Sequence, residues 1–368
     1  MAALSSSLSQ FRQQERRVAF FMVLPAAFLL ISFLLVPFFM AFYLSMTDQR
    51  LVSPRPPAFV GLDNYSRLLT VRVITLEPLT DEETGEVLRD AQGQPEYPRA
   101  RNVLRENESY EGLREYSQFN LLGRRVLVAA GDPVFIRSFF NNVYFATIVV
   151  PVQSSFALFL ALLVNQKLRA TNAFRTIYFS PVVTTMAVIS VVWFFLYQPD
   201  QGMINAVLGV FGIGPLQWLQ DPRTAMPAIM LLSIWQGVGF QMIIYLAGLQ
   251  DIPDVLYEAS ALDGAGRWQQ FRYVTLPSLR NTTIFIAVSS TILAFKLFTQ
   301  VEIMTFGTGG PANSTTTIIL HLVSQGFKQQ RVGYASAIAV IFVMIVIGIG
   351  LIQWTLFRLL GRKEAYNA

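Results

Sequence analysis

Residues 226–249 read MPAIMLLSIWQGVGFQMIIYLAGL and carry no charged side chain. About 20 apolar residues are enough for a helix to cross the hydrocarbon core of a bilayer. Five further blocks have similar length and character: 19–46, 139–164, 176–197, 281–304 and 332–357. One such block could be a buried core helix, but six in one chain favour a membrane protein. We therefore predict an all-α integral membrane protein with six transmembrane helices.

The composition agrees with this class and excludes several others. Hydrophobic residues make up 53% of the 368 residues and charged residues only 14%, well below the roughly 25% of ordinary soluble domains. The chain has no Cys and a single His, His321. Disulfide scaffolds, cysteine nucleophiles and Cys/His zinc sites are therefore excluded, and we expect neither a catalytic nor a metal site.

The positions of the basic residues predict an orientation. If both termini are cytoplasmic, the short inner segments carry four clusters of three basic residues: Arg12, Arg16, Arg17; Lys167, Arg169, Arg175; Arg267, Arg272, Arg280; and Arg358, Arg362, Lys363. The short outer loops carry only Arg223, Lys328 and Arg331. Cytoplasmic loops are enriched in Lys and Arg, so we predict a multi-pass protein of the cell (inner) membrane with both termini in the cytoplasm. The net charge of +5 then reflects the lipid bilayer and not nucleic acid.

Residues 47–138 differ from the rest, because they hold 26 of the 51 charged residues. We predict a mixed extracytoplasmic insert there, between spans one and two, with strands at 71–76 and 124–128. The insert either docks an external partner or is a solvated insertion without that role. The predicted organisation is thus 1–46 for the N-terminus and first span, 47–138 for the insert, and 139–368 for a five-span core.

The cytoplasmic loop 250–280 reads QDIPDVLYEASALDGAGRWQQFRYVTLPSLR. We expect a helix up to Asp263 that Gly264 ends, and a second short helix over 267–274. Small residues there permit close approach by another protein, and Glu258 and Asp263 offer charged contacts. Taken by itself, such a segment could also be an ordinary amphipathic connector.

The residue pattern of this loop favours a specific family. Glu258-Ala259-Ser260, then Gly264, Val274 and Leu276-Pro277, resembles the EAA motif of the permease subunits of ABC importers. Ser260 stands where Ala is usual, and Val274 where Ile is usual. The motif also lies at the topological position that the family requires.

Other segments are similar to the carbohydrate-uptake permeases of this family, which include the maltose transporter subunit. They are 59–65 after the first span, Asn141-Asn142, Phe174-Arg175, Asn205, 309–316 and 333–337. The resemblance covers nearly the whole chain except about 70–130. The large insert makes the chain similar to the larger member of the permease pair.

The resemblance implies several partners. A separate ATP-binding-cassette ATPase dimer would bind the loop through six residues: Glu258, Ala259, Ser260, Asp263, Gly264 and Ala265. That ATPase would hold ATP and Mg, because this chain has no Gly-Lys dipeptide and hence no phosphate-binding P-loop, and no cofactor is expected in it. An extracytoplasmic solute-binding protein and a second homologous permease subunit would complete the importer.

Candidate residues for the substrate pathway lie in spans four and five. A sugar needs aromatic faces and amide or hydroxyl groups, and Gly237, Phe240, Gln241 and Tyr245 recur at helical spacing on one face. The resemblance implies solute contacts at Gly237, Phe240, Ser290, Leu293, Ala294 and Leu297. Helix packing is the alternative role of these positions. Charged residues inside the fifth block are Lys296 and Glu302, of which Lys296 is either structural or faces the pathway.

Three functional classes compete. The predicted one is a binding-protein-dependent ABC importer permease for a sugar or related polyol; a different small solute is the alternative within it. A secondary transporter would need intramembrane carboxylates for ion coupling, and only Glu302 is available. A membrane enzyme lacks any supporting motif. Maltose, trehalose, other α-glucosides, a glucosylated polyol and glycerol phosphate all fit the sequence, and His321 has no predicted role.

Overall fold

The computed structural model describes residues 2–81, 86–89, 93–121, 124–166 and 171–366, and their side chains except in 2–14, 171–172 and 360–366. The basic residues Lys167 and Arg169 of the orientation argument lie outside the described residues, and the side chains of Arg12, Arg362 and Lys363 are among those not described. The chain forms two compact units: Met1–Ser66 with Gln325–Ile341, and Arg67–Ser324 with Phe342–Ala368.

The first unit holds the first apolar block. Its helix runs through α1 (Ala2–Leu30), a π-helical turn (Ile31–Leu35) and α2 (Val36–Leu44), although Pro25 lies inside α1. The segment after α2 is fixed by Asn64, whose amide donates to the carbonyl oxygens of Ser45 at 2.8 Å and Thr47 at 2.9 Å. The unit also contains most of α3 (Asp63–Leu69), a π-helical turn at Ser324–Lys328 and the beginning of α16 (Val332–Tyr366).

The second unit contains the small sheet. β1 (Val71–Leu76) and β2 (Arg114–Leu121) both pair antiparallel with β3 (Arg124–Ala130), so the strand order is β1-β3-β2. Helix α4 (Ala100–Glu106) covers one face, where its Leu104 is buried in a cluster with Leu127. The predicted strands at 71–76 and 124–128 are confirmed, while β2 was not expected.

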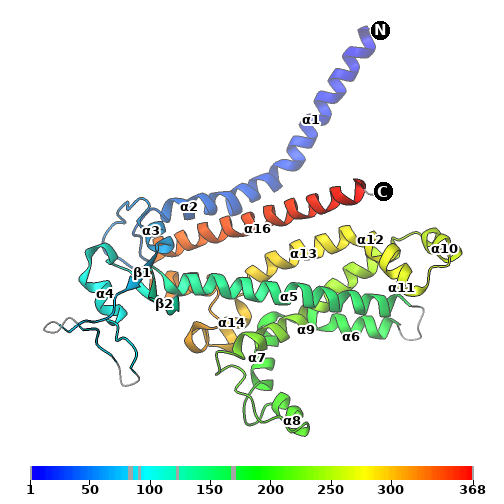
Figure 1. Cartoon of the computed structure of the whole chain (residues 1–368). Coiled ribbons are helices and arrows are strands. Elements are labelled where there is room, and N and C mark those ends of the chain that lie inside the picture. Colours follow the sequence, from blue (N-terminus) through cyan, green and yellow to red (C-terminus); the bar gives the residue numbers. More distant parts are fainter. Residues whose placement is uncertain (1, 82–85, 90–92, 122–123, 167–170, 367–368) are drawn as a thin grey trace. The chain divides into compact units, whose positions relative to one another are not determined.

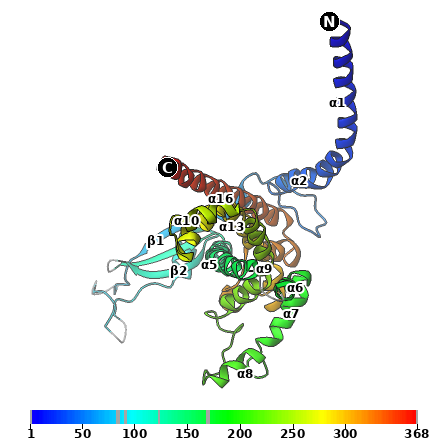
Figure 2. The ribbon, with the colours of Figure 1, turned by 90° about the vertical axis from the view of Figure 1, so that its right-hand side faces the viewer.

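The remaining helices of the second unit are α5 (Pro133–Asn165), α6 (Thr171–Val183), α7 (Met186–Leu196), α8 (Met203–Val210), α9 (Ala225–Gln250), α10 (Asp254–Leu262), α11 (Arg267–Gln270), α12 (Leu276–Ser278), α13 (Arg280–Phe295), α14 (Thr299–Met304) and α15 (Ile318–Val323). A π-helical turn, Phe271–Thr275, joins α11 to α12. α5 and α9 lie side by side in both views (Figure 1 and Figure 2). Figure 1 also shows the sheet and the α10–α12 segment at opposite ends of this unit.

Four helices are long and apolar enough to cross a membrane: Glu15–Leu44, Pro133–Asn165, Ala225–Gln250 and Val332–Leu359. Two further pairs meet the same test together but are bent, by 97° between α6 and α7 and by 61° between 267–278 and α13, so the described helices give up to six spans. The helical membrane fold is therefore confirmed, but the third apolar block is not one straight helix. Thr185 has an extended backbone, with φ −62° and ψ 141°, and this breaks the helix between α6 and α7.

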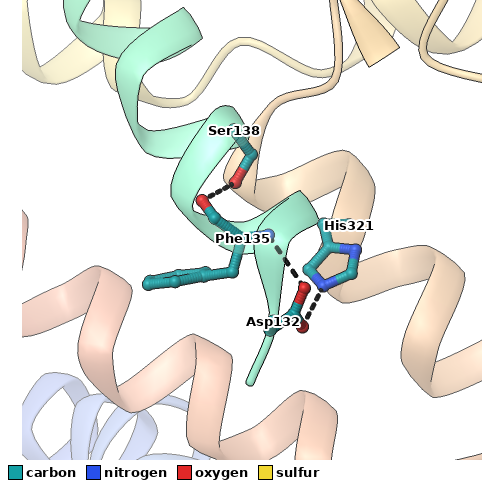
Figure 3. Close-up of polar contacts among 4 residues, drawn as sticks. All are labelled: Asp132, Phe135, Ser138 and His321. Atoms are coloured by element: carbon teal, nitrogen blue, oxygen red, sulfur yellow. Dashed lines mark hydrogen bonds and ion pairs between the residues drawn. The ribbon is translucent and has the colours of Figure 1, made fainter. Parts of the chain in front are cut away.

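The beginning of α5 is held by a buried polar contact (Figure 3). Asp132 caps the helix, because its Oδ1 accepts the Phe135 backbone N–H at 2.9 Å. Its Oδ2 accepts from Nε2 of His321 on α15 at 2.7 Å.

The predicted boundary at residue 138 falls one turn into α5, and that at residue 46 falls just after α2.

Candidate functional site

A cavity of about 530 Å³ lies between α5, α9 and α13, with further lining from α6, α7 and α14. Its size is that of an ordinary small-molecule site. Seven of the eight residues that the sequence placed on a substrate pathway line it: Gly237, Phe240, Gln241, Ser290, Leu293, Ala294 and Leu297. The eighth, Tyr245, is 1% exposed and packs instead in the apolar cluster formed with α5 and the beginning of α13.

Polar groups in this cavity come mainly from glutamines. Gln241 donates through Nε2 to Oγ of Ser290 at 2.7 Å, which joins α9 to α13. Its Oε1 is buried and has no hydrogen-bond partner in the described part of the chain. Burying an unpaired acceptor is unfavourable, so a rotation of the side chain that brings this oxygen to the cavity surface would allow it to accept from a bound hydroxyl or amine.

Two of the glutamines that line the cavity were not predicted from the sequence. Gln153 comes from α5 and Gln300 from α14, where its Nε2 donates to Oγ of Ser233 at 3.4 Å. A signal for Gln153 existed, because it is a polar residue inside a long apolar block. Nothing in the sequence indicated that α14 bends back to this cavity.

The cavity also has an aromatic and a cationic group. The Phe240 side chain lines it and is 51% exposed. Lys296, which follows the last residue of α13, lines it as well. A cation is favourable at the negative end of the α13 dipole. Glu302 lies on α14 and is not among the lining residues. The lining therefore combines three phenylalanine rings, hydroxyl groups, one cation and the amides of Gln153, Gln236, Gln241 and Gln300.

The loop after α9 folds as the sequence predicts. α10 ends at Leu262, and Gly264 adopts φ +82°, a left-handed conformation that favours glycine. The Ala265 N–H then donates to the Ser260 carbonyl at 2.9 Å, which closes the turn. Leu262 is 90% exposed, and Val255 and Trp268 of the same loop are 68% and 72% exposed, so the loop exposes several large apolar side chains.

The six predicted contact residues of this loop divide into two groups. Glu258, Ala259, Asp263 and Gly264 are exposed. Ser260 and Ala265 are half-buried, and Ser260 Oγ accepts from Nε2 of Gln270 at 3.2 Å. Ser260 therefore ties α10 to α11 instead of facing outward.

Comparisons with known proteins agree with this architecture. The family described as "Binding-protein-dependent transport system inner membrane component" matches residues 128–363. The chain is 38% identical over 238 residues to the probable ABC transporter permease protein YurN of Bacillus subtilis, covering 63% of this chain and 80% of that protein. It is 36% identical to the lactose transport system permease protein LacF of Rhizobium radiobacter, covering 61% and 76%. It is 34% identical to the sn-glycerol-3-phosphate transport system permease protein UgpA of Pectobacterium atrosepticum, covering 64% and 78%.

Among solved structures, the fold is similar to that of a bacterial ABC transporter involved in the import of the acidic polysaccharide alginate. The TM-score is 0.67 at 19% identity, and the match covers 95% of this chain and 98% of that chain. At this identity the likeness establishes the fold. The chain belongs to the family of inner membrane components of binding-protein-dependent transport systems.

Proposed function

We propose that the cavity between α5, α9 and α13 is this subunit's part of a translocation pathway for a sugar or a related polyol. The observation that carries the proposal is the unpaired Oε1 of Gln241, buried in the cavity wall beside the exposed ring of Phe240. A sugar offers hydroxyl donors to the amide and C–H faces to the ring. The names of LacF and UgpA, a lactose and a glycerol phosphate permease, support the same solute class.

The loop that contains α10 is the coupling element of this proposal. Its exposed Glu258 and Leu262 would contact a separate ATPase dimer, which would bind ATP and Mg. Movement of α10 as a rigid body would then switch the cavity between two accessible states. Ser260 and Gly264 would act inside the loop, by fixing α10 against α11 and by forming its terminal turn.

The other partners follow from the family. A solute-binding protein would deliver the sugar at the end of the second unit that carries the sheet, and a second permease subunit would supply the other half of the pathway. The loop of α10–α12, at the opposite end of the second unit from the sheet, would then lie in the cytoplasm. The basic residues near both chain ends favour the same side for the termini.

Uptake by the reconstituted importer tests the pathway. Phe240→Ala should lower the rate of sugar uptake while leaving the amount of bound ATPase unchanged. Leu231→Ala is the matched control, because Leu231 is also an exposed apolar residue of α9 but does not line the cavity. Equal uptake by both variants would contradict the proposed pathway.

Substitution of Glu258 separates the ABC importer from a secondary transporter. Glu258→Lys should abolish uptake and weaken ATPase binding, whereas Glu111→Lys in the exposed part of the insert should do neither. A secondary transporter would keep its uptake in the Glu258→Lys variant. If the importer carries another small solute, the wild type would take up that solute and no sugar. The Glu258→Lys variant would then lose uptake of that solute.

A further inference from the structure

A second cavity, of about 470 Å³, lies between the end of α7 and the segment that follows α14. We call it the α7–α14 cleft; its lining includes Phe194, Tyr197, Gln198, Gln220, Thr305 and Phe306. It shares no lining residue with the first cavity. We propose that the α7–α14 cleft is a second carbohydrate subsite of the same pathway, an inference that rests on the proposed function.

Aromatic rings form one wall of this cleft. The rings of Phe194 and Phe306 meet edge to face, with centroids 5.2 Å apart and planes at 81°. Phe306 is 74% exposed, so most of its ring remains open to a ligand. Tyr197 adds a third ring, but its hydroxyl is occupied because it donates to the Ala228 carbonyl at 2.8 Å. Open aromatic faces beside polar groups suit the C–H faces of a sugar ring.

Two amides supply the polar groups. Gln198 and Gln220 line the cleft, and neither side chain makes a hydrogen bond to another described residue. Each free amide offers an acceptor oxygen and two N–H donors, which match the hydroxyl groups of a sugar. A cleft built only for lipid or helix packing would not need them.

The backbone presents Phe306 at a conformational cost. Its φ is 52°, in the left-handed region that a bulky side chain rarely adopts. Hydrogen bonds on both sides hold it there, from Gly307 N–H to the Glu302 carbonyl at 2.8 Å and from Thr308 Oγ1 to the Thr305 carbonyl at 2.6 Å. Strained residues of this kind are concentrated at ligand-binding and switch positions, which agrees with a binding role for the ring.

Helix α14 places the two cavities next to each other along the chain. Gln300 lines the first cavity, while Met304 and Thr305 line the α7–α14 cleft. Four residues of helix advance by only about 6 Å. The sugar would therefore meet neighbouring subsites at the two ends of one short helix.

Cysteine protection tests this inference, because the chain has no native Cys. Single variants Gln198→Cys in the cleft, Gln236→Cys in the first cavity and Gln201→Cys outside both would be prepared in the complete importer in lipid nanodiscs. Labelling by N-ethylmaleimide would be followed with lactose, xylose, glycerol 3-phosphate or an alginate pentasaccharide as the probe. We expect any probe that slows labelling at position 236 several-fold to slow it at position 198 as well, and to leave position 201 unchanged.

A second substitution makes the test specific for the ring. Phe306→Ala should remove the protection at position 198 but keep it at position 236, whereas Phe306→Tyr should keep both. Protection at 236 without protection at 198 would overturn the second subsite and leave the proposed function standing. If no probe protects either position and none is taken up, both the inference and the proposed function are overturned.

Discussion

At the residue scale, the buried contact between Asp132 and His321 joins parts of the chain that are 189 positions apart. Their side chains are only 10% and 6% exposed. Removing one member leaves the other buried without its partner, which typically costs about 1–3 kcal/mol. We therefore expect His321→Ala to lower the thermal unfolding temperature of the purified protein, measured by the near-UV signal.

The helix cap provides the control for this prediction. Asp132→Asn keeps a side-chain oxygen that can accept the Phe135 N–H and an amide that can still approach His321. It should therefore cost less than His321→Ala. If His321→Ala unfolds at the wild-type temperature, the contact contributes nothing to stability, and the beginning of α5 is held by other packing.

Gln241 and Gln353 allow a matched comparison within the same fold. Gln241 donates through Nε2 to the Ser290 hydroxyl at 2.7 Å, and Gln353 donates through Nε2 to the Thr291 hydroxyl at 2.8 Å. In both side chains Oε1 is buried and has no partner among the described residues. Only Gln241 lines the first cavity. If a sugar hydroxyl donates to its Oε1, Gln241→Leu should lose about 1–3 kcal/mol of solute binding, or a roughly 5- to 150-fold higher KM for uptake.

The comparison variant is Gln353→Leu, which should change stability but not KM. Transport kinetics in proteoliposomes, with the rate and the KM fitted separately, would measure both. An unchanged KM in Gln241→Leu would show that the solute does not use this oxygen.

Sequence reasoning reached the cavity residues but not these pairings. Helical spacing and the family resemblance both select Phe240, whereas spacing alone selects Gln241 and the resemblance alone selects Ser290. Tyr245 has the same helical spacing but packs against α5. One face of a helix in a bundle can line a cavity at one turn and pack against a neighbouring helix at the next. The contact of His321 with Asp132 depends on tertiary folding, and no local pattern encodes it.

At the element scale, the packing of α9 against α6 depends on a single glycine. A Cβ built at Gly239 would lie 2.0 Å from the carbonyl oxygen of Tyr178, a backbone atom that cannot rotate away. Small residues allow such close approach between membrane helices. Gly239→Ala should therefore destabilise the protein by about 1–3 kcal/mol, as other overpacked cores are destabilised.

Gly209 in α8 is the matched control, since a Cβ there would meet nothing within 4 Å. Gly209→Ala should be neutral or slightly stabilising, because alanine favours helix more than glycine does. Unfolding temperatures of the two variants would decide between the effects. Equal stability of both would mean that α6 and α9 can separate at no cost.

Breaks within elements were the part of the fold that apolar length could not predict. Residues 176–197 carry no charge, so length and hydrophobicity alone predict one span, although Pro181 and the Thr184-Thr185 pair lie where α6 gives way to α7. Strand β2 was also missed, because only Phe119 and Leu121 of its outer half are large and apolar, and both are exposed. It is a strand because β3 offers an edge to pair with.

At the scale of the whole molecule, the second unit separates two surfaces of different chemistry. The sheet lies at one end of this unit, and α10–α12 lie at the other. Helices of membrane-crossing length, α5 and α9, run between them. This separation is what an importer requires, because the solute arrives on one side of the membrane and ATP is hydrolysed on the other.

The orientation of these two ends gives the last prediction. Arg267, Arg272 and Arg280 cluster in and beside the loop of α10–α12, and basic loops remain on the cytoplasmic side. In this chain without native Cys, Glu111→Cys in the insert and Gln269→Cys on α11 are both exposed positions. A membrane-impermeant maleimide added to intact spheroplasts should label Glu111→Cys, and should label Gln269→Cys only after the membrane is permeabilised. The reverse pattern would place α10 outside the cell, where no ATPase could reach it, and would contradict both the orientation and the coupling role of Glu258.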